Sequence, residues 1–245
     1  MAGHSKWANI KHQKAKSDAK KGKAFTRVTK EIITAVKLGG SDPRSNPRLR
    51  MAIQKAREAN LPNDNIDRNI KKAAGADQGD IFELTYEIFG PGGVGIIVET
   101  VTDNKNRTAT DLSIAATGKK RGGNVARPGS VTHNFDRQGL IQIARDSITE
   151  EALLELVLDA GATDLEVEEE VYIVVTEPSG LYAVKDVIDN KGLRCLESGF
   201  DWIPKVSVPY NEEVFKANKA IIDFLEELDD VNTVYHNMEL PEDEE

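Results

Sequence analysis

Basic residues recur along residues 23–38 at intervals that bring them to one side of a helix. At about 100° per residue, four cations fall within roughly 80° of one another, namely Lys23, Arg27, Lys30 and Lys37. The apolar residues expected on the opposite side are Phe25, Val28, Ile32 and Val36. One face would pack while the other presents cations, which attract the phosphates of a polyanion. The sequence therefore predicts a phosphate-binding helix, and a merely solvated lysine face is the alternative.

The residues before and after this helix extend the predicted contact. The remaining predicted contacts are Lys6, Trp7, Lys11, His12, Lys14, Lys20, Arg48 and Arg50. An indole such as that of Trp7 can stack on a base or ribose, as aromatic residues do in single-stranded and RNA sites. It can equally serve as a structural anchor for the arm. Lys and Arg dominate the set, so backbone contacts rather than base readout are expected to supply most of the affinity.

The charge of the chain is divided between its two ends. Its 245 residues have a formal net charge of −9. Residues 1–72 nevertheless contain 18 Lys and Arg against 6 Asp and Glu, a net charge of +12. The rest of the chain has 14 basic and 35 acidic residues, a net charge of −21. This asymmetry favours nucleic acid as the partner, either DNA or ribosomal RNA on the ribosome. The alternative is that the basic part docks on the acidic remainder.

Residues 103–127 form a second basic segment, with 6 basic and 2 acidic residues in an otherwise acidic region. Asn106 or Asp103 is expected to cap a helix whose exposed amides could hold an anion. A second contact is therefore predicted at Asn104, Lys105, Asn106, Arg107, Lys120 and Arg121. Ordinary helix capping with solvated cations accounts for the same residues equally well.

The residues that usually carry catalysis are scattered. The four histidines, His4, His12, His133 and His236, fall in different predicted elements and show no metal-ligand spacing. Cys195 is the single cysteine, which excludes an internal disulfide and favours the reducing cytoplasm. No stretch approaches the roughly 20 apolar residues of a membrane span. We therefore expect a non-enzymatic cytoplasmic protein with no cofactor, no metal and no membrane contact; the oligomeric state stays open.

Helix and strand signals predict an α+β fold. Three short helices, punctuated by Gly39-Gly40, Asn46-Pro47 and Gly75, form a bundle with a weak likeness to a helix-turn-helix. Strands and helices follow, with a strand expected near residues 130–135. The stretch from residue 139 to 203 has the order β-α-β-β-α-β of a ferredoxin-like unit. The piece before it lacks a helix, which the segment 212–228 can supply.

We therefore expect an N-terminal three-helix bundle followed by two ferredoxin-like α/β domains, one inserted into the other. The predicted boundaries are 1–78 for the basic helical domain, 79–136 with 205–240 for the discontinuous middle domain, 137–204 for the insert and 241–245 for an acidic tail.

Several strings distributed along nearly the whole chain resemble the YebC/PmpR family, which includes mitochondrial translational activators. They are Gly3-His4-Ser5-Lys6-Trp7, Lys11-His12, Gly22-Lys23 with Phe25, Asn46-Pro47-Arg48-Leu49-Arg50, Tyr86-Glu87, Gly90-Pro91-Gly92-Gly93, Thr102-Asp103-Asn104 with Asn106-Arg107-Thr108, Gly122-Gly123 and Gly129-Ser130-Val131. The resemblance implies three domains, no cofactor and a role in regulating gene expression. Members are generally labelled DNA-binding transcriptional regulators, whereas others resemble translation factors that act at the ribosome. An acidic protein-interaction adaptor is the further alternative.

Overall fold

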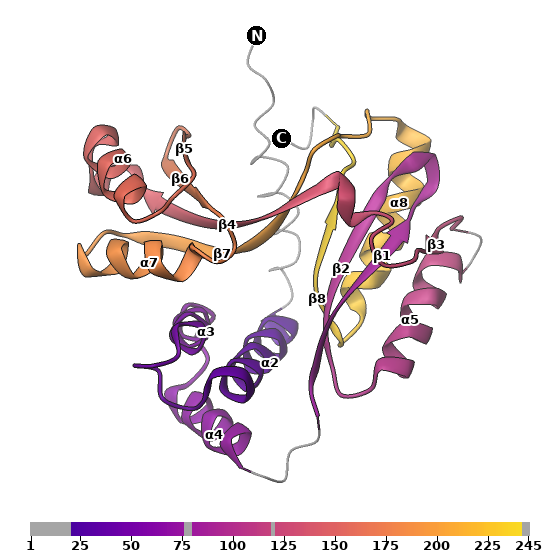
Figure 1. Ribbon diagram of the computed structural model, residues 1–245. Helices are drawn as coiled ribbons and strands as arrows, with labels where there is room; N and C mark the ends of the chain where they lie inside the picture. Colours follow the sequence, from indigo (N-terminus) through magenta and orange to yellow (C-terminus); the bar gives the residue numbers. More distant parts are fainter. Residues whose placement is uncertain (1–20, 76–79, 119–120, 242–245) are drawn as a thin grey trace. The chain divides into compact units, whose positions relative to one another are not determined.

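The computed structural model describes residues 21–75, 80–118 and 121–241, with side chains from residue 25 onward (Figure 1). The predicted α+β class is confirmed, because in these described ranges three helices come first and two four-stranded antiparallel sheets follow. Phe135–Ile203 form one compact unit, and the described residues on either side of them form the other. Within the described ranges, no helix has the length and apolar character needed to cross a membrane.

The described part of the first unit begins with three helices that share a small apolar core. They are α2 (Lys21–Gly39), α3 (Pro47–Glu58) and α4 (Asn63–Ala74). Ile32, Leu49 and Ala52 are fully buried between them. The predicted packing face of α2 is confirmed at Ile32 and Val36 but is wrong at Phe25, which is 37% exposed. The apolar contact begins only one turn later, at Val28.

Asn46 joins the end of α2 to the start of α3. Its side-chain oxygen accepts a hydrogen bond from the backbone N–H of Leu49 at 3.0 Å, as the predicted N-cap requires. Its amide nitrogen donates to the carbonyls of Ala35 and Gly40, both at 2.8 Å. Gly40, with φ +85°, ends α2 in the left-handed conformation that glycine adopts without strain.

The same unit continues as a sheet with the strand order β3-β1-β2-β8. Its elements are β1 (Phe82–Phe89), β2 (Gly95–Thr102), α5 (Lys105–Thr117), β3 (Asn124–Val125), α8 (Glu212–Glu227) and β8 (Val231–His236). Ile96, Leu112 and Ile221 are fully buried in one core cluster, so α5 and α8 both pack on this sheet. The sheet is completed by β8, which comes much later in the chain: Ile96 of β2 pairs with His236 of β8, 140 residues further along.

The strand expected near residues 130–135 is a wrong prediction. Thr132–Asn134 form a short 3-10 turn instead. The buried carboxylate of Glu87 accepts hydrogen bonds from the backbone N–H groups of Gly129, Val131 and Thr132. Those three donors are therefore not available to a strand ladder. The hydrogen bonds also hold the pKa of Glu87 below its usual value, although burial by itself raises that pKa.

The second unit is a complete β-α-β-β-α-β arrangement. Its elements are β4 (Phe135–Ala144), α6 (Glu150–Asp159), β5 (Asp164–Val167), β6 (Val171–Thr176), α7 (Leu181–Asn190) and β7 (Cys195–Pro204). The strand order β5-β6-β4-β7 is that of a ferredoxin-like sheet. Leu153 and Val157 of α6 and Leu181 of α7 are fully buried and anchor the helices.

The two sheets have equivalent strand positions reached by different chain orders. In each, one strand leads through a helix to an edge strand, as β4 leads through α6 to β5 and β2 leads through α5 to β3. A further strand lies between these two strands in each sheet. In the second unit it is β6, the third strand of that unit along the chain, whereas in the other sheet it is β1, the first strand. The second unit is inserted between β3 and α8. The backbone N–H of Lys205 donates to the carbonyl of Asn134 at 2.8 Å. This hydrogen bond joins the two segments of the first unit directly before and after the insertion.

Candidate nucleic-acid interface

Much of the predicted N-terminal contact lies outside the described residues. This holds for Lys6, Trp7, Lys11, His12, Lys14 and Lys20, for Lys120 of the second contact and for the side chain of Lys23. Arg27 and Lys30 on α2 are described, and both are half-buried. Lys37 is described as well and is also half-buried, so the structure places three of the four cations that the helical spacing assigned to one face.

The ammonium group of Lys30 is held inside the first unit. It donates to the carbonyls of Val101 at 3.1 Å and Asp229 at 2.6 Å, and it pairs with the carboxylate of Asp230 at 3.2 Å. A lysine has three donors, and these three acceptors use all of them. We therefore leave Lys30 out of the surface proposed below for binding phosphate.

Asp230 is the centre of a polar cluster that the sequence did not reveal. Its side chain is only 12% exposed, and it accepts from Arg107 at 2.7 Å, Thr108 at 2.9 Å and Thr102 at 3.0 Å in addition to Lys30. Burial by itself raises the pKa of Asp230. The hydrogen bonds from Arg107, Thr108 and Lys30 lower this pKa by more than burial raises it, so it lies below the usual value of 3.8. We refer to Asp230 with Lys30, Thr102, Arg107 and Thr108 as the Asp230 cluster.

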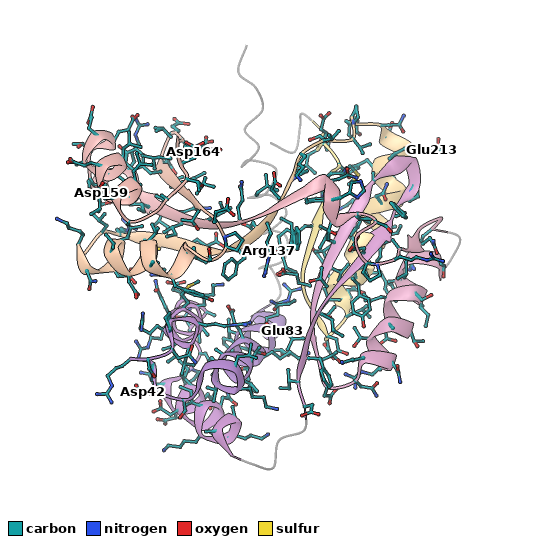
Figure 2. All side chains as sticks on the ribbon, viewed as in Figure 1. Asp42, Glu83, Arg137, Asp159, Asp164 and Glu213 are labelled. Atoms are coloured by element: carbon teal, nitrogen blue, oxygen red, sulfur yellow. The ribbon has the colours of Figure 1, made fainter. Side chains whose placement is uncertain are left out.

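The predicted contacts on α3 also have partners within the first unit. Arg48 forms a two-pronged ion pair with Glu83 of β1, one of its hydrogen bonds measuring 2.9 Å; Glu83 is labelled in Figure 2. Arg50 donates to the carbonyls of Pro43 at 3.0 Å and Arg44 at 3.2 Å. Both side chains are half-buried, so they present part of their surface to solvent.

The second predicted contact is occupied largely by structural interactions. Asn104, not Asn106 or Asp103, caps α5, since its side chain accepts from the N–H of Arg107 at 3.1 Å; the predicted cap is wrong by one or two positions. Asp103 instead pairs with Arg107 at 2.8 Å. Lys105 lies 3.8 Å from the ring centre of Phe82. Asn106 is exposed and uses its backbone carbonyl to accept from Thr110 at 2.9 Å.

Arg121 closes the other end of α5. It donates to the carbonyls of Ile114 at 3.2 Å and Ala115 at 3.0 Å, and its guanidinium lies 4.5 Å from the ring centre of Phe224. A cation at this position satisfies carbonyls that the helix itself leaves without a donor. Helix capping therefore accounts for Asn104 and Arg121. Lys105 instead contacts the ring of Phe82, and Arg107 pairs with Asp103 and Asp230.

The cations that the structure leaves most available lie elsewhere on the helical module, which we define as residues 21–75. Arg57 at the end of α3 and Lys71 and Lys72 near the end of α4 are exposed. Within the part of the chain that the structure describes, none of these three side chains has an ion pair or hydrogen bond. The sequence contained the signal, because Lys71 and Lys72 lie opposite the buried Ile66 on a helical wheel.

The described residues contain no group of three or more His, Cys, Asp or Glu side chains placed to hold a metal ion. What the helical module offers is charge. It contains 13 Lys and Arg against 5 Asp and Glu. Such a surface can bind and orient a polyanion through its phosphates.

A basic helical module followed by two ferredoxin-like sheets, one inserted in the other, defines a class of multidomain α+β proteins. A model of the TACO1/YebC protein N-terminal domain matches residues 5–76, and a model of the TACO1/YebC second and third domain matches residues 81–238. The chain belongs to the TACO1/YebC family, which confirms the resemblance found in the sequence.

Several known proteins are similar to this chain over almost its whole length. A probable transcriptional regulatory protein of Protochlamydia amoebophila is 58% identical over 243 residues, which are 99% of this chain and 98% of that protein. A probable transcriptional regulatory protein of Chlamydia pneumoniae is 54% identical, over 97% of this chain and 100% of its own length. The crystal structure of a conserved hypothetical protein from Aquifex aeolicus has a TM-score of 0.80 and 42% identity, covering 95% of this chain and 96% of that one.

Proposed function

We propose that this chain is a non-enzymatic regulator of gene expression that binds nucleic acid through its helical module. The observation that carries this proposal is a set of three exposed cations, Arg57, Lys71 and Lys72, which have no ion pair among the described residues. They belong to a module with a large excess of basic residues. Fields of one sign attract polyanions and raise the rate of encounter. The regulatory names given to similar proteins support the same role. The target in this proposal is DNA near regulated genes.

Neutralising Lys71 and Lys72 together is expected to weaken nucleic-acid binding in a salt-dependent way. Each phosphate contact contributes about 0.7 to 0.9 to the slope of log affinity against log salt. The double variant Lys71→Gln/Lys72→Gln should therefore reduce the slope by about 1.5 and the affinity at 100 mM salt by roughly tenfold or more. Fluorescence anisotropy with a labelled duplex and a labelled single-stranded RNA, each at several salt concentrations, measures both quantities.

The matched control is Lys191→Gln/Arg194→Gln, which removes two exposed cations from the second unit. It should leave the slope at the value of the unaltered chain. An unchanged slope in the α4 variant, or an equal loss in the control, would show that phosphate is bound through another surface.

A second candidate function is that of a translation factor bound to ribosomal RNA. The outward side of α4 favours it, because the ammonium groups of Lys71 and Lys72 bind phosphate as point charges. The side chain of Arg68 is moreover held by that of Asn65. Recognition would then depend on the backbone and shape of the nucleic acid, as is common for RNA.

Crosslinking in living cells, followed by sequencing of the DNA and RNA fractions in parallel, separates the two targets. The transcriptional proposal predicts enrichment at discrete promoters with RNA at background. Enrichment at defined positions of ribosomal RNA, with promoter DNA at background, would instead assign the chain to translation. A chain that crosslinks to neither nucleic acid above background would contradict both.

A further inference from the structure

Helix α6 of the second unit exposes two leucines one turn apart. Leu154 is 39% exposed and Leu158 is 48% exposed, whereas Leu153 and Val157 are fully buried. Residues four apart lie next to each other on one side of a helix, so the exposed pair forms a short apolar stripe. Because Leu153 and Val157 already attach α6 to its unit, the stripe is not needed to hold this helix in place.

Carboxylates flank this stripe on both sides. At about 100° per residue, Glu150 lies on one side of Leu154, and Glu151 and Glu155 lie on the other. A fourth carboxylate, Asp159, ends the helix, which contains no basic residue. In the described part of the chain, none of these four side chains has an ion pair or hydrogen bond.

The helix dipole explains only two of the four carboxylates on α6. Acidic residues in the first turn interact favourably with the positive end of the helix dipole, which accounts for Glu150 and Glu151. Asp159 stands at the negative end, where a carboxylate is unfavourable. The helix dipole therefore does not explain Asp159, and Leu154 and Leu158 leave apolar surface in contact with solvent.

We propose that this α6 face docks a basic amphipathic helix of a partner protein. Leu154 and Leu158 would contact the apolar stripe of the partner helix, and Glu150, Glu151 and Glu155 would pair with Lys or Arg on either side of that stripe. Apolar anchors at helical spacing, bordered by complementary charge, are the usual components of helix recognition. This inference does not rest on the proposed binding of nucleic acid.

Charge disfavours nucleic acid and the α6 face of a second copy as occupants of this face. Residues 135–203 contain 16 Asp and Glu against 5 Lys and Arg. Two members of the acidic set, Asp159 and Asp164, are labelled in Figure 2. A field of this sign repels the phosphates of nucleic acid, and it equally disfavours the α6 face of a second copy.

A synthetic peptide tests the proposal directly on the full chain. The probe is a fluorescein-labelled helix of about 16 residues with leucines at i, i+4 and i+7 and lysines on both flanks. We expect binding with a Kd in the range of tens of micromolar, as is usual for a small interface. A scrambled peptide of identical composition should bind about tenfold more weakly, and equal binding of the two peptides would overturn the proposal.

Matched variants locate the contact. Leu154→Ser should weaken probe binding at least about fivefold, whereas Leu196→Ser on β7, where the leucine is also 39% exposed, should have no effect. Glu155→Gln should weaken binding more at 50 mM than at 300 mM salt, and Glu177→Gln serves as its control. Equal losses in variant and control would overturn the assignment to α6.

Two further measurements test where the probe binds and whether the chain's own basic arm occupies the α6 face. Backbone amide shifts of the unaltered chain should change at α6 on addition of the probe, which tests the site even if Leu154→Ser fails to fold; shifts confined to other elements overturn it. The chain's own basic arm is the other possible occupant. If the probe binds only when Lys6, Lys11, Lys14 and Lys20 are replaced by Gln, the arm covers this face and the assignment to a separate protein is overturned.

Discussion

Replacing Asp230 by alanine is expected to lower the free energy of unfolding by about 3 kcal/mol. The carboxylate accepts from Lys30, Arg107, Thr102 and Thr108, and its loss leaves two cations without their shared counter-charge. The estimate lies at the low end for breaking a buried ion pair because the side chain of Arg107 is about half exposed. Urea denaturation of the two proteins at pH 7 measures the difference.

The preceding residue provides the control for this experiment. Asp229 contributes only its backbone carbonyl to Lys30, and its side chain is exposed, so Asp229→Ala retains the interaction. We expect that variant to unfold within about 0.5 kcal/mol of the unaltered chain. Similar losses in Asp229→Ala and Asp230→Ala would contradict the structural role of the Asp230 cluster.

Acidification from pH 7 to pH 4 is expected to cost the fold up to about 3 kcal/mol through His236 alone. Burial lowers the pKa of this imidazole from 6.5 to about 4. Its Nδ1 atom accepts a hydrogen bond from the backbone N–H of Met238 at 3.2 Å. Between these two values the unfolded chain binds a proton that the folded chain does not. The free energy of unfolding therefore falls as the pH falls through this window.

The variant His236→Asn keeps a hydrogen-bond acceptor but removes the titrating group. Its unfolding free energy, measured in urea at several pH values, should decline about 3 kcal/mol less than that of the unaltered chain between pH 7 and pH 4. His133→Asn replaces an exposed imidazole and should leave the decline in place. Parallel curves for His236→Asn and the unaltered chain would argue against a buried neutral imidazole.

The sequence predicted most elements of the fold because their ends are marked by neighbouring residues. Asn46 caps α3 and Gly75 follows α4, as local helix signals indicate. The wrong strand near residues 130–135 has a distant cause. Its amides are taken by Glu87, more than forty residues earlier in the chain. Local propensity carries no information about such a partner.

The candidate site was harder to predict for the same reason. Helical spacing indicates which side chains share a face, but it does not indicate what they contact. Lys30 has the spacing of a phosphate ligand and is nevertheless held by Asp230, 200 residues further along the chain. The exposed Lys71 and Lys72 follow the same helical rule and remain without such a partner in the described part of the chain. Only the folded structure distinguishes the two cases.

The insertion between β3 and α8 fixes an order of events during synthesis. Residues 135–203 leave the ribosome as a complete set of strands and helices, so the second unit can fold as soon as its last strand emerges. The sheet of the first unit can be completed only later, because β8 is the last strand to be made and pairs with β2.

Until β8 is made, the apolar edge of β2, including Ile96 and Ile97, has no neighbouring strand on that side. The nascent chain thus carries an open hydrophobic strand through most of its synthesis, and this strand is the place at which aggregation or a chaperone would act first.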